Sequence, residues 1–108
     1  MAWRQEKAEG LIRDIAAEFL ERESNQRSLI TVTRASVSPD LKRATFYITV
    51  LPEEMEEHAL DFAKRKRKEL REFLKTRVKS RTLPFLDVEI DKAEKTRQRL
   101  EELKNDKA

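Results

Sequence analysis

The stretch SVSPDLKRATFYITVL, residues 36–51, decides the fold of this chain. Ser38-Pro39-Asp40 has turn chemistry, because proline pre-sets φ and aspartate can bond nearby backbone groups. After the turn, apolar residues alternate with mostly polar ones: Ala44, Phe46, Ile48 and Val50 against Arg43, Thr45, Tyr47 and Thr49. Residues 29–37, LITVTRASV, are rich in β-branched side chains, so the two segments predict a β-hairpin. The alternation further indicates a sheet that is covered on only one face.

Helical patterns flank this hairpin on both sides. Before it, apolar residues recur at spacings of three and four, which is typical of a helix with one buried stripe: Leu11, Ile12, Ile15, Ala16, Phe19 and Leu20. After it, Pro52 begins a second helical segment, with acids in the first turns and bases in the last, as the helix dipole favours. A third strand is predicted over residues 83–91, and the tail from Lys92 has only a weak helical pattern.

The second helical segment, residues 53–80, is too long for the sheet beside it. A continuous helix of this length would span about 42 Å, whereas strands of eight to ten residues are only about 30 Å long. Its apolar stripe also passes through Lys66, between Phe62 and Leu70. We therefore expect a break or bend near residues 64–68, with Lys66 partly buried along its methylene groups and its ammonium group in solvent.

These elements predict an α+β fold in the order helix, strand, strand, helix, kink, helix, strand. The three strands form one sheet with the helices on one face, and the connection between parallel strands should be right-handed. A marginal C-terminal helix completes the chain. We expect one folded domain over residues 1–91 and a charged, partly helical tail over residues 92–108.

Composition and motif content argue against several classes of protein. The chain has 108 residues and no cysteine, so it is the size of a single domain without disulfides or thiolate metal ligands, and a cytoplasmic location is the simplest inference. It lacks the ~20-residue apolar run of a membrane span, and its single glycine cannot make a phosphate-binding glycine loop. His58, the only histidine, stands among glutamates on an expected exposed turn. We expect no cofactor, no metal and no enzymatic activity.

Charge is distributed unevenly along the sequence. Residues 52–63 contain five acids and no lysine or arginine, whereas residues 64–81 contain ten bases and two acids. The second segment alone carries +8 in a chain whose net charge is +3. A local field of this sign attracts a polyanion, and nucleic acid is the commonest one in a cell.

The run KRKRK, residues 64–68, has several interpretations. A solvated helix face is the simplest one, and a nuclear-import signal fits poorly because the run lies inside a helical pattern. We favour a cationic ridge that contacts RNA phosphates without reading sequence. Arg43, with Tyr47 and the threonines on the open face of the sheet, is a weaker second candidate, which the solvent side of a strand explains more simply. The predicted RNA-binding residues are Lys64, Arg65, Arg67, Lys68, Arg71, Lys75, Lys79, Arg81 and Arg43.

The order and spacing of motifs resemble the ribosome-binding factor A family over residues 5–103. In that family a Ser-x-Asp-Leu turn leads into an Ala-x-x-Tyr strand, and five residues fit the pattern: Ser38, Asp40, Leu41, Ala44 and Tyr47. Further matches are the Arg-Glu end of the first helix, the approach to the last strand and the tail: Arg22, Glu23, Leu83, Pro84, Leu86, Asp91, Arg99, Leu100 and Leu103.

This resemblance implies a type II KH-like RNA-binding domain over residues 1–91. It also implies a protein without enzymatic activity that binds the immature small ribosomal subunit and its ribosomal RNA near the 5′-terminal helix. Such a protein assists late rRNA maturation and growth in the cold. We expect a monomer that does not bind membranes, with maturation GTPases as candidate partners.

The sequence departs from the family pattern at three places. Asn25-Gln26-Arg27 replaces the usual Asp-Pro-Arg, and Arg97 replaces a glycine in the tail. Lys66-Arg67-Lys68 stands where the family has Ala-x-Gly at the helix kink. Because Gly10 is the only glycine, the GxxG clamp of ordinary KH domains is excluded. Another ribosome-associated protein, such as a hibernation factor, and a protein–protein adaptor with a basic helix remain as alternatives.

Overall fold

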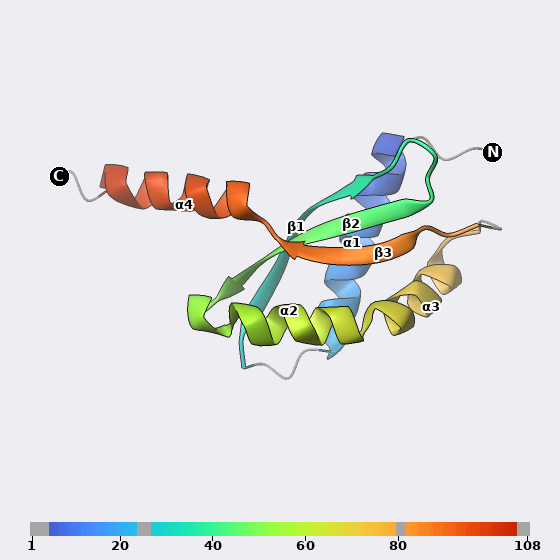
Figure 1. Ribbon diagram of the computed structural model, residues 1–108, viewed down its shortest axis with the longest axis horizontal. Helices are drawn as coiled ribbons and strands as arrows, with labels where there is room; N and C mark the ends of the chain where they lie inside the picture. The colour runs from blue at the N-terminus through green and yellow to red at the C-terminus, as the bar shows by residue number, and fades with distance from the viewer. Residues whose placement is uncertain (1–4, 24–26, 80–81, 106–108) are drawn as a thin grey trace.

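The computed structural model describes residues 5–23, 27–79 and 82–105 (Figure 1). Their helices and strands follow the predicted order, with the long helix divided in two and a further helix at the C-terminal end. The elements are α1 (Gln5–Glu23), β1 (Leu29–Val37), β2 (Arg43–Leu51), a short 3-10 helix η1 (Glu53–Met55), α2 (Glu56–Arg65), α3 (Arg67–Arg77), β3 (Phe85–Ile90) and α4 (Lys92–Asn105). This is the α+β, type II KH-like arrangement that the sequence predicts.

The three strands form one mixed sheet in the order β1-β2-β3. β1 and β2 pair antiparallel from Leu29 opposite Leu51 to Val37 opposite Ala44, with one irregularity between Val32 and Arg34. β2 and β3 pair parallel, and Arg43 lies beside Phe85 at the start of both strands. The parallel pair is made possible by α2 and α3, which carry the chain back to the edge of the sheet.

The core lies between one face of this sheet and helices α1 to α3. Alternation in β2 is as predicted: Phe46 and Ile48 are fully buried, while Tyr47 is only partly buried. The helices contribute their apolar stripes to the same cluster, which includes Ile12, Ile15, Phe19, Leu20, Ala59, Ala63, Leu70 and Leu74. The prediction of a sheet covered on one face is confirmed for these three helices.

The predicted helix break occurs at Lys66. Its backbone has φ −91° and ψ 1°, and it separates α2 from α3. The Lys66 side chain is 30% exposed, and its Nζ lies 3.2 Å from Glu69 and 3.6 Å from Glu23. The stem therefore packs while the ammonium group reaches two carboxylates at the surface. Lys66-Arg67-Lys68 thus permits a kink without a glycine.

Helix α4 is the C-terminal helix that the sequence predicts only weakly. It is a regular helix of 14 residues that continues from β3 and projects away from the sheet (Figure 1). Its leucines, Leu100 and Leu103, are 56% and 61% exposed. The helix is attached through polar contacts at its first turns, which a search for apolar periodicity does not detect.

Two smaller differences concern element ends. The second helical segment ends at Arg77 rather than at residue 80, and β3 covers residues 85–90 within the predicted 83–91. His58 is exposed on α2, as expected. Within the described part of the chain, no helix is long and apolar enough to cross a membrane.

Candidate nucleic-acid interface

A basic groove of about 670 Å³ lies where the start of α3 meets the start of β2 and β3. We use the name basic groove for this site, which is lined by Arg43, Ala44, Thr45, Arg67, Lys68, Arg71, Phe85, Leu86 and Asp87. Four of these side chains are cationic and one is acidic. The groove therefore joins two candidates that the sequence kept apart, the basic helix and Arg43 of the sheet.

The strand register places Arg43 and Phe85 side by side at the beginning of the groove. They are partners in the parallel β2–β3 ladder, and the Phe85 amide donates to the Lys42 carbonyl at 2.9 Å. Both side chains are exposed, and Phe85 is 72% exposed. Adjacent strands lie about 4.8 Å apart, so a cation and an aromatic ring share one surface here.

Arg67 and Arg71 are held in place by contacts within the protein. Arg67 forms an ion pair with Asp87 at 3.1 Å, and its Nε donates to the Lys64 carbonyl at 3.0 Å. Arg71 donates to the carbonyls of Leu83 and Pro84 at 3.2 and 3.4 Å. Neutral carbonyl acceptors leave the charge of Arg71 uncompensated, whereas Asp87 neutralises that of Arg67.

Arg43 and Lys68 differ from these two arginines. Both side chains are exposed, and neither has an ion-pair partner among residues 5–23, 27–79 and 82–105. A cation in this state can bind a phosphate without first breaking an internal ion pair. These two residues are the cations of the groove most available to a polyanion.

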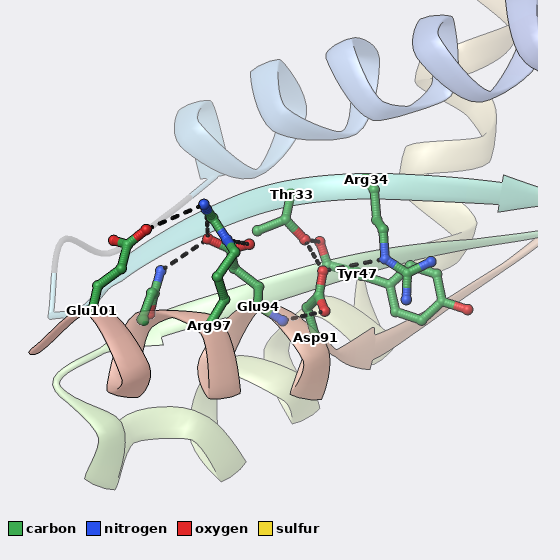
Figure 2. A network of polar contacts seen from close by, with 8 residues as sticks. Thr33, Arg34, Tyr47, Asp91, Glu94, Arg97 and Glu101 are labelled. Carbon is green, nitrogen blue, oxygen red and sulfur yellow. Dashed lines mark hydrogen bonds and ion pairs between the residues drawn. The ribbon is translucent and has the colours of Figure 1, made fainter. Parts of the chain in front are cut away.

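The opposite end of the sheet carries a second polar cluster, drawn in Figure 2. Asp91 follows β3 and is almost fully buried, with 2% of its surface exposed. Its carboxylate accepts from the Thr33 hydroxyl, from the Arg34 guanidinium at 3.3 Å and from the Glu94 amide at 3.0 Å. The last contact caps the N-terminus of α4, so one carboxylate ties this helix to β1.

The surroundings of Asp91 explain its charge state. Burial alone would raise the pKa of Asp91, but the Thr33 hydroxyl, the Glu94 amide and Arg34 together hold the pKa below its usual value. Thr33 is the additional residue at the irregularity between Val32 and Arg34. Such a bulge redirects a side chain, and here it brings the hydroxyl to Asp91.

Ion pairs between η1, α2 and α4 complete this cluster, which we call the α4 junction (Glu53, Glu56, Asp91, Glu94, Lys95 and Arg99). Lys95 lies 2.8 Å from Glu53 and 2.7 Å from Glu56, and Arg99 lies 3.2 Å from Glu53. Hydrogen bonding from Lys95 lowers the pKa of Glu53, and the bond to Glu53 raises the pKa of Lys95. The acidic segment that precedes the basic run thus binds the cations of the tail.

The turn before β2 is stabilised by the residues that carry the sequence motif. The Leu41 amide donates to the Ser38 carbonyl at 2.8 Å, and the Lys42 amide donates to Asp40 at 3.0 Å. The Ser38 hydroxyl bond to Asp40, more than the Lys42 amide, lowers the pKa of that carboxyl. Leu41 has a φ of 61°, an unusual value for a residue with a side chain. This turn sets Arg43 at the first position of β2.

Comparison with known proteins identifies the family. The family model described as ribosome-binding factor A matches residues 4–104. This chain belongs to the ribosome-binding factor A family. Two curated relatives named ribosome-binding factor A, from Methylobacterium nodulans and from Methylobacterium sp. strain 4-46, are each 38% identical over 88 residues, or 77% of this chain. The matches span 65% and 63% of the relatives' own lengths, slightly less than two thirds.

Solved structures of the ribosome-binding factor A family share the fold. The crystal structure of ribosome-binding factor A from Thermus thermophilus has 27% sequence identity and a TM-score of 0.72, over 82% of this chain and 97% of that chain. The solution structure of a Thermotoga maritima protein described as a putative ribosome binding factor A has 26% identity and a TM-score of 0.69, over 85% and 91%.

A third similar structure concerns a complex. It is a homology model of Thermus thermophilus ribosome binding factor A, fitted into a cryo-EM map of a 30S complex with that factor. It has 28% identity to this chain and a TM-score of 0.68, over 78% of this chain and 91% of that chain.

The structure brings four of the nine predicted RNA-binding residues together in one groove. Arg43, Arg67, Lys68 and Arg71 line the basic groove. Four other predicted residues, Lys64, Arg65, Lys75 and Lys79, lie outside its lining, and Lys75 pairs with Glu72 at 3.1 Å. Arg81 lies outside the described residues. The part that these four cations outside the groove play in RNA binding stays a prediction.

Phe85 is a residue of interest that the sequence did not single out, and Asp91 is one to which it assigned no role. Phe85 is outward by strand alternation, but its position beside the basic helix depends on the tertiary fold. Asp91 had a local signal, because aspartate followed three residues later by Glu94 is a helix-capping pattern. Among the described residues no histidine, cysteine or carboxylate group is arranged to hold a metal ion.

Proposed function

We propose that this protein binds the small ribosomal subunit through its ribosomal RNA and assists late maturation of that RNA. Two observations support the proposal: the chain belongs to the ribosome-binding factor A family, and a relative of similar fold was fitted into a map of a 30S complex. The single observation that carries it furthest is the basic groove, where Arg43 and Lys68 have no carboxylate partner among the residues described.

The groove fits phosphate binding better than base reading. Arginine and lysine side chains bind phosphate oxygens and release counterions, which supplies affinity without sequence information. Lys64 and Arg65 of α2 and Lys79 beyond α3 are exposed cations outside the groove lining that add to the positive charge of this segment. Residues 1–91 act as the RNA-binding domain in this account, and the tail from residue 92 extends from it.

Partners and location follow from the same proposal. The protein acts as a cytoplasmic monomer on immature small subunits and works alongside maturation GTPases. It needs no cofactor and catalyses no reaction of its own, because its contribution is to bind and stabilise one conformation of the RNA. The effect should be greatest in the cold, where RNA refolding is slow.

Co-sedimentation with ribosomes on a sucrose gradient tests the proposal. The wild-type protein should migrate with free small subunits, and the double variant Arg43→Ala with Lys68→Ala should remain near the top of the gradient. Migration with inactive or dimeric ribosomes would instead identify a hibernation factor. Absence from all ribosomal fractions would support a protein–protein adaptor.

A control variant separates loss of the groove's cations from a general loss of positive charge. Lys104 is an exposed cation near the end of α4, remote in sequence from the groove. Lys104→Ala should migrate like the wild type. Equal loss of binding in this control would mean that total charge, rather than the groove, determines the association.

A further inference from the structure

Phe85 is an exposed aromatic residue in a protein whose other phenylalanines are packed. Of the five, Phe19 and Phe46 are buried and Phe62 and Phe73 are partly buried against the core. Phe85 is 72% exposed on the edge strand β3. A single exposed apolar side chain is ordinary on protein surfaces, so exposure alone assigns no role.

The surroundings of Phe85 distinguish it from a random exposed residue. It lines the basic groove together with Arg43, its neighbour in the β2–β3 ladder, and Lys68 of α3. The exposed leucines Leu29, Leu51, Leu100 and Leu103 lie outside this groove. An aromatic ring that shares a groove with available cations matches the sites that bind single-stranded nucleic acid, where bases stack and phosphates meet cations.

The rings of two other aromatic residues are already covered by cations of the protein. Arg34 lies 3.8 Å from the centroid of the Tyr47 ring. Arg77 and Arg22 lie 4.7 and 5.5 Å from the centroid of the Phe73 ring. Phe85 also has one such neighbour, Arg71 at 5.6 Å, yet most of its ring surface stays accessible.

Arg71 is fixed rather than free to move over the ring. Its guanidinium donates to the carbonyls of Leu83 and Pro84, the two residues directly before Phe85. These bonds hold Arg71 and the start of β3 together. A base that stacks on Phe85 would therefore meet a preorganised ring with a cation beside it, which reduces the entropy lost on binding.

We propose that Phe85 is a stacking site for one unpaired nucleobase of RNA, with Arg43 and Lys68 binding the adjacent phosphates. This inference rests on the proposed function for its choice of RNA and adds that the bound segment is single-stranded. A duplex keeps its bases stacked on each other, so it could meet the cations but not the ring.

The probe is a short single-stranded RNA that carries one 2-aminopurine, compared with the same strand annealed to its complement. The wild type should quench the fluorescence of the single strand and bind it more tightly than the duplex. Because stacking on an aromatic residue contributes about 1–3 kcal/mol per base, Phe85→Ala should weaken single-strand binding by about five- to a hundred-fold. Its affinity for the duplex should stay within two-fold of the wild type.

Two further variants separate stacking from apolar contact and from folding. Phe85→Trp should retain binding and quenching, whereas Phe85→Leu, which keeps an apolar side chain without a ring, should behave like Phe85→Ala. Leu51→Ala is the matched control, because Leu51 is 62% exposed at the other end of β2. It should leave both RNA affinities unchanged.

Several outcomes would overturn the stacking site. They are no RNA binding by the wild type, unchanged single-strand binding by Phe85→Ala, and equal losses for single strand and duplex. The proposed function is tested separately by co-sedimentation. If the Phe85→Ala variant still binds small subunits and its affinity for single-stranded RNA is unchanged, the stacking site is wrong but the proposed function stands. If quenching depends on Phe85 but the protein never co-sediments with small subunits, the proposed function is wrong but the stacking site stands.

Discussion

The two ends of the sheet use their charged residues in opposite ways. Where β2 and β3 begin, Arg43 and Lys68 line a groove without a carboxylate partner among the residues that the structure describes. Where β3 ends, Lys95 and Arg34 are paired with acids of the α4 junction. The number of cations in a segment therefore does not locate a nucleic-acid surface. We propose instead that this surface lies at the groove cations that have no carboxylate partner among the residues described.

The acidic segment before the basic run explains part of this division. Glu53 and Glu56 stand at the start of the second helical segment, where carboxylates favour the helix dipole, and they bind Lys95. They are directed to the tail and away from the groove. The uneven charge of residues 52–81 thus has two results. Its acids bind the cations of α4 at one end of the sheet, and its bases leave a positive field at the other end.

The largest effect that we predict concerns the buried member of the α4 junction. Asp91→Ala removes the cap of α4 and leaves the Glu94 amide without its acceptor, while the Thr33 hydroxyl keeps only the Tyr47 carbonyl, at 3.3 Å. Loss of a helix cap and of buried hydrogen bonds should lower the free energy of unfolding by about 2–4 kcal/mol. Urea denaturation measures this change.

The matched control is Glu89→Ala, which removes an exposed carboxylate from β3 two residues earlier. Its free energy of unfolding should change by less than about 0.5 kcal/mol. Equal changes in the free energy of unfolding for the two variants would show that the α4 junction contributes no more to stability than an exposed surface residue. RNA affinity of the folded Asp91→Ala protein should match that of the wild type.

Acid should weaken the α4 junction before it affects the cations of the groove. The pKa of Asp91 lies below the ordinary value of 3.8 in the folded protein, so its contribution to stability is present above that value and is lost as the pH falls through the folded pKa. The urea midpoint should therefore decrease below about pH 4. Asp91→Asn should flatten this dependence. The part due to Asp40, Glu53 and Glu94, whose pKa values are also lowered, should remain.

Sequence patterns predicted the features that depend on local periodicity. Alternation in residues 43–50 placed Phe46 in the core and Tyr47 on the other face. The apolar stripe through Lys66 predicted where the long helix would break. In each case the feature depends on whether a side chain lies in the core or in solvent. The spacing of apolar and polar residues along the sequence is enough to predict this.

The composition of the groove could not be predicted in the same way. Phe85 and Lys68 are separated by α3 and the loop that follows it, and only the parallel pairing of β3 with β2 brings the ring to the helix. Likewise, nothing local indicates that Lys95 will meet Glu53. Alternation and helical periodicity predict which residues lie on the buried face of a strand or helix. Contacts between elements depend instead on how the elements pack together.

Lys66 provides a smaller test at the boundary between the two helices. Its ammonium group pairs with Glu69 and Glu23, and hydrogen bonding to Glu69 raises its pKa. Surface pairs of this kind contribute little, and alanine favours a helix, so Lys66→Ala should leave the urea midpoint unchanged or slightly higher. Because this cation is already paired, its loss should reduce RNA affinity less than Lys68→Ala. A larger reduction would place Lys66 in the interface.

The central claim is that unpaired cations of the groove bind RNA, whereas paired cations at the α4 junction do not. The most direct test compares Lys68→Ala with Lys95→Ala, two variants with the same charge change, in RNA binding measured over a range of salt concentrations. Lys68→Ala should make the slope of log K against log[salt] shallower by about 0.7–0.9, the value for one lost phosphate contact. Lys95→Ala should leave the slope of the wild type unchanged. Equal slopes for the two variants would contradict the account.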